Sequence, residues 1–159
     1  QYCGNTDWDY HNWYAIRKRG PDSRGFYFLC WDTEQIFEGN NDSNLDINNY
    51  AAPTWIFHAL LQNTRFVKQY LKRASEVLAE DGHLGQASVV HLWDSLYCNI
   101  KSAVYVEAAR WGDYRKDVHP YQTQAPLYTV DDHFMKERYR LLNDYFPYRS
   151  GKALSLINA

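Results

Sequence analysis

QASVVHLWDSLYCNIKSAVYVEAARW, residues 86–111, is the longest stretch of this sequence with a helical pattern. Neither Pro nor Gly interrupts it, and its apolar residues recur at spacings that place them on one face of an α-helix. These residues are Val89, Leu92, Trp93, Leu96, Ile100, Ala103 and Val104. The pattern predicts a long amphipathic helix at the centre of the fold, and Gly112-Asp113 is expected to end it.

Two further helices are predicted before this stretch. Pro53 suits a first helical turn, and apolar residues follow it with helical spacing as far as Asn63. Thr64 is the expected cap of a second helix, which carries an apolar stripe and ends near Asp81-Gly82. The C-terminal two-thirds of the chain is therefore expected to be mainly helical.

After residue 111 the sequence predicts an irregular segment and then two more helices. The segment through Thr129 is polar and contains Pro120 and Pro126. Thr129 and the acidic residues after it are typical of a helix start, and Pro147 is expected to open a final helix.

The N-terminal part has a different pattern. Two runs rich in β-formers, residues 13–17 and 26–31, flank Gly20-Pro-Asp-Ser-Arg-Gly25, which has the composition of a turn. Residues 38–49 are polar, rich in Asn and Asp, and read as a loop. The predicted fold class is therefore α+β: an N-terminal β-hairpin within residues 1–50, followed by a helical region over residues 51–159.

Composition limits the classes of function. The chain has 159 residues, of which 45 % are hydrophobic and 23 % charged, so one folded domain with a sizeable core is expected. Seventeen basic and 19 acidic residues give a net charge of -2, which argues against nucleic acid as a partner. The sequence has no apolar run long enough to predict a membrane span.

Asp7, Asn12 and Asp32 follow the order of the parts that transfer phosphate in protein kinases. There, an Asp accepts the proton of the substrate hydroxyl, an Asn five residues later binds Mg²⁺, and a second Asp also holds the metal. In this sequence the predicted hairpin separates Asn12 from Asp32 and brings them together. The spacing alone is common by chance, and loop or capping residues are the alternative interpretation.

Several stretches together resemble the spore-coat protein H (CotH) kinase family, and they occur in the order found in that family. The N-terminal stretches are Gly4-Asn-Thr-Asp-Trp8, Asn12-Trp-Tyr-Ala15 and Phe28-Leu-Cys-Trp-Asp-Thr-Glu34. The later ones are Leu61-Gln-Asn-Thr-Arg-Phe66, Glu107-Ala-Ala-Arg-Trp-Gly-Asp113 and Tyr145-Phe-Pro-Tyr-Arg149. The resemblance covers nearly the whole chain.

The resemblance implies an atypical protein kinase that uses ATP with Mg²⁺ or Mn²⁺ to phosphorylate Ser or Thr hydroxyls of a protein substrate. It implies that Asp7 is the catalytic aspartate and that Asn12 and Asp32 bind the metal and, through it, the nucleotide. Residues 1–159 would then be the C-terminal portion of the kinase domain, without the N-terminal lobe that supplies the Gly-rich loop and lysine. The family is also compatible with a bacterial cell-surface or secreted location.

The first residue, Gln1, and the single methionine, Met135, lead us to expect a fragment or a processed product. We therefore expect the isolated chain to transfer little phosphate. Asp9 departs from the kinase pattern, because a Lys often stands two residues after the catalytic Asp, and we expect its charge to oppose phosphate binding. Two alternatives follow: a pseudokinase scaffold, or a noncatalytic module whose many aromatic residues bind glycan or protein.

Overall fold

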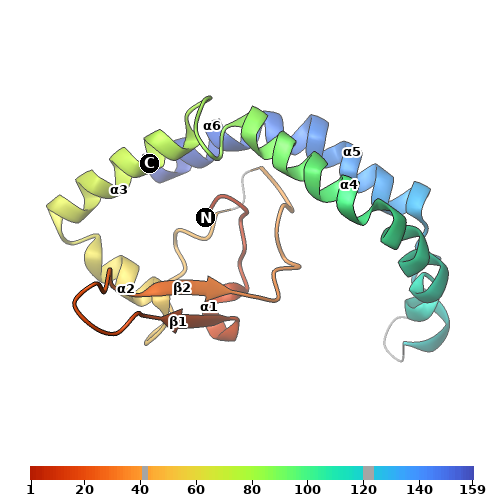
Figure 1. Cartoon of the computed structure of the whole chain (residues 1–159), viewed down its shortest axis with the longest axis horizontal. Coiled ribbons are helices and arrows are strands. Elements are labelled where there is room, and N and C mark those ends of the chain that lie inside the picture. Colours follow the sequence, from red (N-terminus) through yellow and green to blue (C-terminus); the bar gives the residue numbers. More distant parts are fainter. Residues whose placement is uncertain (41–42, 120–123) are drawn as a thin grey trace.

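The computed structural model describes residues 1–40, 43–119 and 124–159. Figure 1 shows the longer helices forming an arch, with a β-hairpin and two short helices beneath one end of it. The arch consists of α3 (Thr64–Leu78), α4 (Gln86–Trp111), α5 (Met135–Arg140) and α6 (Phe146–Ile157). Beneath it lie α1 (Trp8–His11), β1 (Trp13–Ile16), β2 (Tyr27–Cys30) and α2 (Pro53–Leu60). The predicted mainly helical α+β class is confirmed.

The predicted β-hairpin is confirmed. Strands β1 and β2 pair antiparallel, and Trp13 lies opposite Cys30. Gly20 and Gly25 in the connecting segment have φ angles of 99° and 94°, a region that glycine enters without a steric cost. The two glycines that led the sequence analysis to expect a turn here therefore allow the chain to reverse between β1 and β2.

Helices α2 and α3 begin at the predicted residues, but one cap differs. Helix α2 begins at Pro53, as expected. Helix α3 begins at Thr64, yet its cap is Asn63, whose Oδ1 accepts hydrogen bonds from the backbone N–H groups of Arg65 and Phe66 at 2.9 and 3.2 Å. Thr64 already has helical backbone geometry, so the residue before it satisfies the first free N–H groups.

The predicted long helix is confirmed as α4, but the prediction that it is central is wrong. Leu92, Leu96 and Ile100 on its apolar face are 60, 49 and 47 % exposed. Only the first turns, around Val89 and Trp93, pack against the core. Figure 1 gives the reason, because the second half of α4 runs away from α6 and from the core beside it.

The two predicted C-terminal helices are joined into one helical run. The π-helical segments η2 (Val130–Phe134) and η3 (Leu141–Tyr145) precede α5 and α6 without a break. Thr129 caps the run as predicted, since its hydroxyl accepts from the backbone N–H of Asp132 at 3.1 Å. Pro147 lies in the first turn of α6, where its missing N–H disturbs the helical hydrogen bonds least.

Between α4 and this run, residues 112–119 and 124–129 are irregular apart from one π-helical turn, η1 (Tyr114–Val118). Pro120 lies outside the described residues. The described residues of the predicted loop 38–49 likewise contain neither helix nor strand.

The core is small and lies where α4 meets the junction of η3 and α6. Leu141, Tyr145 and Phe146 are its fully buried members, and Phe37 and Trp93 pack against them. Three of these rings contact Phe37 edge-on, with centroids 5.3 to 6.3 Å away. Phe37 therefore ties the segment after the hairpin to the helical arch.

Much apolar surface remains uncovered. The accessible surface is 11610 Å², whereas a compact monomer of 18.8 kDa exposes about 8,300 Å². The hairpin and the far half of α4 contribute large exposed hydrophobic side chains to this excess. In the described ranges, none of the helices combines the length and hydropathy needed to span a membrane.

A buried carboxylate connects α1 to the start of α2. Asp9 is 1 % exposed and accepts hydrogen bonds from the backbone N–H of Thr54 at 3.0 Å, the Thr54 hydroxyl at 2.6 Å and the Asn49 amide at 2.9 Å. The N-cap residue of α2 is Ala52, which has no side-chain oxygen. Asp9 therefore caps α2 from a distant part of the chain and complements its helix dipole.

We predict that Asp9→Ala destabilises the chain by about 3 kcal/mol, because it leaves the two buried donors of Thr54 without an acceptor and removes the hydrogen bond of the Asn49 amide. Urea unfolding followed by circular dichroism measures the change. The control is Asp22→Ala, which removes an exposed carboxylate paired with Lys18 and should change stability by less than about 0.5 kcal/mol. Equal stability of the two variants would contradict the capping role.

Candidate functional site

The side chains of Asp7 and Asn12 are in contact at the two ends of α1. Asp7 is the N-cap residue and Asn12 the C-cap residue of this single helical turn. The turn brings the chain back on itself, so the Asn12 amide Nδ2 donates to Asp7 Oδ2 at 3.0 Å. The spacing of five residues noted in the sequence therefore corresponds to direct contact.

Asn5 fixes the entry into this turn. Its Oδ1 accepts from the backbone N–H groups of Asp7 and Trp8 at 3.0 and 3.1 Å, which starts the helix in place of a cap from Asp7 itself. Asn5 is buried, so this geometry is shielded from water. The Asp7 carboxylate is thereby left to face Asn12.

Trp31 holds Asn12 from the opposite strand. Its backbone N–H donates to the Asn12 carbonyl at 3.1 Å, and its indole N–H donates to Asn12 Oδ1 at 3.0 Å. Since an indole nitrogen only donates, the amide oxygen of Asn12 must face Trp31 and the amide nitrogen must face Asp7. Both ends of the Asn12 amide are thus oriented, and the side chain is 2 % exposed.

Asp32 follows directly after this contact. It is exposed and has a φ angle of 49°, a left-handed conformation that is uncommon for residues other than glycine. Such strained residues cluster at functional sites. The structure therefore brings Asp7 and Asn12 into contact and places Asp32 one residue beyond the tryptophan that binds Asn12.

Arg149 of α6 anchors the two segments that carry these residues. It is 1 % exposed and donates to three backbone carbonyls, those of Tyr2 at 2.5 Å, Asn40 at 2.6 Å and Gln1 at 3.0 Å. The sequence included Arg149 only as the end of a family-like stretch. Its position shows that this stretch secures the loop leading into Asp7.

A second anchor acts on the segment after Asp32. The backbone N–H of Phe37 donates to the Cys3 carbonyl at 2.9 Å, and Arg140 donates to the Phe37 carbonyl at 2.6 Å. Arg140 also pairs with Glu137, and that hydrogen bond lowers the pKa of the Glu137 carboxyl. The loop before Asp7 and the loop after Asp32 are thus held to each other and to the helical arch.

The charge of Asp9 is not where the sequence led us to expect it. Its carboxylate is directed toward α2 and saturated by Thr54 and Asn49, whereas the Asp7 carboxylate contacts Asn12. The expected opposition of Asp9 to phosphate binding therefore has no support in this geometry.

Asp7, Asn12 and Asp32 carry carboxylate and amide oxygens, the kind of ligands that Mg²⁺ and Mn²⁺ prefer. The structure shows contact between the side chains of Asp7 and Asn12. Asn12 Oδ1 accepts from the Trp31 indole, and the Asn12 side chain is buried. In the part of the chain that the structure describes, no three His, Cys, Asp or Glu residues cluster as a metal site.

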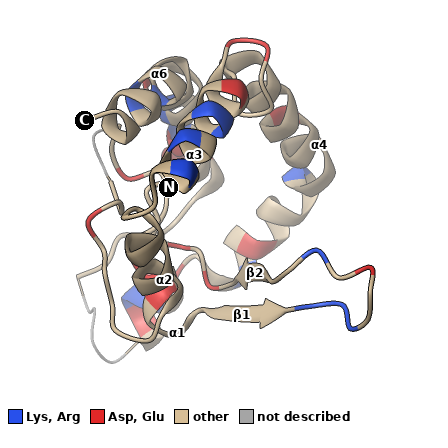
Figure 2. Ribbon diagram, turned by 90° about the vertical axis from the view of Figure 1, so that its left-hand side faces the viewer, with Lys and Arg blue, Asp and Glu red and all other residues tan. Residues whose placement is uncertain are grey.

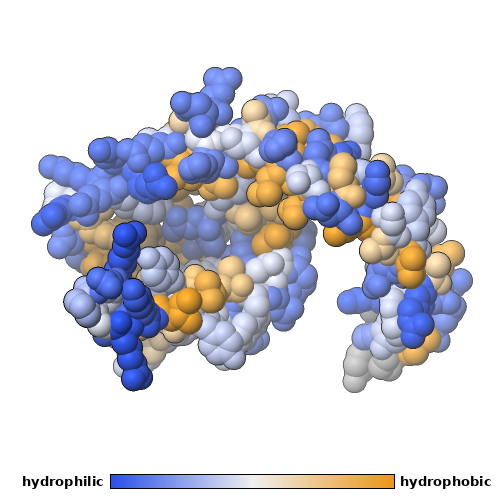
Figure 3. Space-filling model, in the orientation of Figure 1, coloured by the Kyte–Doolittle hydropathy of each residue, from blue (hydrophilic) through white to orange (hydrophobic). Residues whose placement is uncertain are grey.

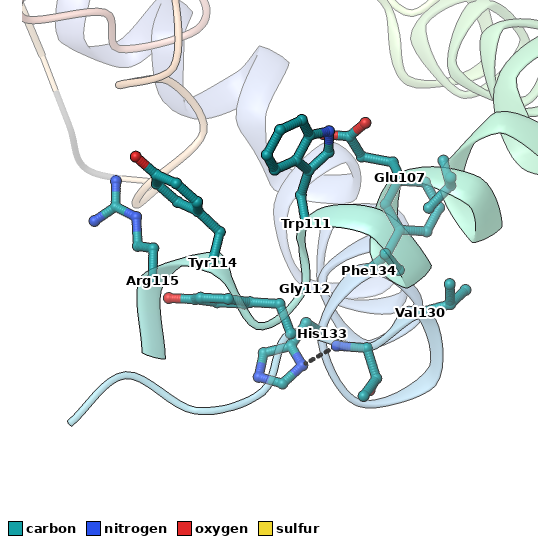
Figure 4. A pocket seen from close by; sticks show the side chains of 12 residues that line it. Glu107, Trp111, Gly112, Tyr114, Arg115, Val130, His133 and Phe134 are labelled. Atoms are coloured by element: carbon teal, nitrogen blue, oxygen red, sulfur yellow. Dashed lines mark hydrogen bonds between the residues drawn. The ribbon is translucent and has the colours of Figure 1, made fainter. Parts of the chain in front are cut away.

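A separate pocket of about 690 Å³ lies at the far end of α4. Figure 4 shows Trp111, Tyr114 and Phe134 around it, with Glu107 on one side and Arg115 on the other. His133 is oriented in its wall, because its Nδ1 accepts from the backbone N–H of Thr129 at 3.1 Å (Figure 4). Four of its twelve lining residues are Trp, Tyr or Phe, so stacking is one kind of contact that it offers.

Gly112 has a structural role beside this pocket. The backbone of Tyr128 crosses it closely, with Tyr128 N–H donating to the Gly112 carbonyl at 2.9 Å. A Cβ at Gly112 would lie 2.3 Å from the Tyr128 carbonyl oxygen. The Trp111-Gly112-Asp113 part of the family-like stretch therefore lets the chain return across the end of α4.

Comparisons with known proteins found no matching family model, no matching curated protein and no matching solved structure.

We predict that Trp31→Phe loosens the Asn12 amide, because Asn12 Oδ1 loses its only hydrogen-bond donor among the described contacts. The expected cost is about 1 kcal/mol of stability, with changed NMR signals of the Asn12 side-chain amide. Trp55→Phe is the control, since Trp55 is 46 % exposed on α2. If the Asn12 amide signals stay unchanged in Trp31→Phe, the proposed orientation is wrong.

Proposed function

We propose that this chain carries the catalytic and metal-binding residues of an atypical, CotH-like protein kinase. The observation that carries the proposal is the double contact of the Asn12 amide, with the Asp7 carboxylate on one side and the Trp31 indole on the other. The order of catalytic loop, hairpin and second aspartate adds support, and so does the family resemblance of the sequence. ATP is the proposed phosphate donor, and a protein Ser or Thr hydroxyl is the proposed acceptor.

The proposed roles follow from position. Asp7 accepts the proton of the substrate hydroxyl, and its hydrogen bond with Asn12 directs the carboxylate. Asn12 Oδ1 and the exposed Asp32 carboxylate hold Mg²⁺ or Mn²⁺, which neutralises charge on the phosphates. The 159 residues contain no Gly-rich loop followed by a lysine, so efficient transfer requires these groups from elsewhere in the enzyme.

We predict that Asp7→Asn lowers phosphate transfer from radiolabelled ATP by about a hundredfold or more, with Mg²⁺-dependent ATP affinity little changed. An amide at position 7 still accepts from Asn12, so the fold is preserved, but it cannot take a proton. The assay uses the natural chain that contains residues 1–159 and a degenerate Ser/Thr peptide pool.

Asp32→Ala in the same protein should abolish Mg²⁺-dependent ATP binding in calorimetric titration, since a methyl group cannot bind a cation. Asp22→Ala, on the hairpin turn, is the matched control and should leave both binding and transfer unchanged. Unaltered ATP affinity in a folded Asp32→Ala variant would contradict its role. Nucleotide binding without transfer in the parent protein would favour the pseudokinase.

A noncatalytic binding module is the second candidate, and the aromatic pocket at the end of α4 favours it. Trp111 and Tyr114 are 47 and 39 % exposed, and Tyr128 is 40 % exposed. Exposed rings with Glu107 and Arg115 beside them suit stacking on a sugar or on a peptide side chain. Ligand binding that Trp111→Ala removes, in a chain without phosphate transfer, would favour this function.

A further inference from the structure

The turn of the β-hairpin, residues 17–25, carries a cluster of positive charge. It contains four exposed basic residues and one exposed acidic residue, Asp22, which gives this basic turn a net charge of +3. Lys18 pairs with Asp22 at 3.3 Å, but the two side chains are 68 and 79 % exposed, so the pair is weak. The basic residues are Arg17, Lys18, Arg19 and Arg24. The charge of the turn is therefore available to an anionic partner.

The basic turn stands clear of the rest of the chain. Apart from chain neighbours, none of the described atoms would lie within 4 Å of a Cβ placed at Gly20 or Gly25. Figure 2 shows the turn projecting beyond the helices, with its basic residues along the projecting segment. A partner can thus approach the turn without displacing any described part of the chain.

One face of the hairpin beside this turn is apolar. The register places Tyr14 opposite Leu29 and Ile16 opposite Tyr27. Because opposite and alternate residues of paired strands share a face of the sheet, these four side chains lie together, and we call them the outer face. They are between 50 and 60 % exposed. Figure 3 shows strongly hydrophilic side chains at the turn with hydrophobic ones directly beside them.

The opposite face of the hairpin belongs to the interior of the molecule. Phe28 and Cys30 of β2 line a cavity of about 740 Å³ together with residues of α3 and α6. The outer face lines neither this cavity nor the aromatic pocket at the end of α4. It therefore offers a partner an apolar surface without one of these pockets.

An anionic lipid bilayer matches this combination of properties. Its phosphates attract Lys and Arg, whose long apolar stems let the charge stay at the headgroups while the backbone lies deeper. Tyr side chains favour the boundary between headgroups and hydrocarbon, and aliphatic side chains enter it. A protein partner commonly anchors a side chain in a pocket, whereas a fluid bilayer needs none. The bilayer thus accounts for both the charge and the apolar face.

A nucleic acid or an acidic peptide accounts for less of the surface. Either would use the basic turn, but the aliphatic side chains of Ile16 and Leu29 have no group that binds phosphate or carboxylate. The net charge of the whole chain, -2, also disfavours a long polyanion. These partners leave the exposure of the outer face unexplained.

We propose that the basic turn and the outer face of the hairpin bind the surface of an anionic lipid bilayer. The cations of the turn contact lipid phosphates, and the outer face enters the interface beneath them. Asn12 and Asp32 adjoin the other ends of the two strands, away from the turn. The binding involves neither ATP nor a metal ion, so it is independent of the proposed kinase function.

Co-sedimentation of the 159-residue chain with vesicles in the presence of EDTA tests the proposal. The vesicles contain phosphatidylcholine alone, or phosphatidylcholine in which phosphatidylglycerol replaces about a third of the lipid. Binding to the mixed vesicles should be at least about tenfold tighter. Raising NaCl from about 0.1 to about 1 M shortens the Debye length from about 10 to about 3 Å and should remove this preference.

Charge reversal locates the basic contact. The double variant Lys18→Glu, Arg19→Glu should bind the mixed vesicles at least about twenty-fivefold more weakly, because each basic residue near an anionic surface is worth about fivefold. The matched control is Arg65→Glu, Lys68→Glu on α3, which makes the same change of net charge and should alter binding by less than about threefold. An equal loss in the two variants would show that overall charge, not the turn, determines binding.

A second pair of variants tests the outer face. Ile16→Thr, Leu29→Thr removes apolar area but keeps residues that form strands, and it should weaken binding to the mixed vesicles about tenfold. Leu92→Thr, Leu96→Thr on α4 is the control, since these leucines are 60 and 49 % exposed, and it should bind normally. Circular dichroism verifies that each variant is folded. If the strand variant fails to fold, the charge reversal still decides the proposal.

Several outcomes would overturn the proposal. These are no binding to the mixed vesicles, equal binding to phosphatidylcholine alone, or binding that survives the reversal of Lys18 and Arg19. Tighter binding of polyglutamate or of single-stranded DNA than of the vesicles would instead assign the turn to an acidic protein or a nucleic acid. The vesicle assay uses none of the candidate catalytic residues, so this proposal and the kinase proposal fail separately.

Discussion

The buried guanidinium of Arg149 holds the N-terminal residues and the segment at Asn40 to helix α6. Its donors bind the carbonyls of Gln1, Tyr2 and Asn40, so the last helix of the chain determines where the first residues lie. A cation that binds backbone carbonyls is a strong, directional anchor in a molecule with few buried hydrophobic residues. Without it, the loop that carries Asp7 would be attached to the arch mainly through Phe37.

Local patterns in the sequence predicted where the helices and strands lie. How these elements pack, and which of their side chains are buried, depends on contacts between residues that are distant in the sequence. The hairpin follows from its turn residues, and α4 from its apolar spacing, because both depend on neighbours in the chain. The exposure of Leu96 could not be predicted, since it depends on which elements cover α4. The hydrogen bond between Asp9 and Thr54 could not be predicted either, because the two residues lie far apart in the sequence. Without that contact, the sequence places the charge of Asp9 beside the candidate phosphate site.

The spacing of Asp7 and Asn12 pointed to a pair of related residues, although it left loop or capping roles open, and it gave no indication of the contact that Trp31 makes with Asn12. Trp31 lies next to Asp32, and only the strand register places it opposite Asn12. Asp7 and Asp9 illustrate the same limit. They lie two residues apart, yet the Asp7 carboxylate contacts Asn12 and the Asp9 carboxylate contacts the start of α2. Two identical side chains therefore have different roles. The sequence shows that both residues are aspartates, but their different roles depend on which groups each carboxylate contacts in the fold.

The second strand has a further consequence for the behaviour of the chain at high concentration. Phe26-Tyr-Phe-Leu-Cys-Trp31 is an uncharged run of β-formers without Pro, the composition of segments that stack into amyloid. In the described part of the chain, the sheet has two strands, so both present an open edge. Arg24 and Asp32 flank the run as charged gatekeepers. Charges that flank such a run oppose the stacking of strands, so the carboxylate of Asp32 suits solubility whether or not it binds a metal.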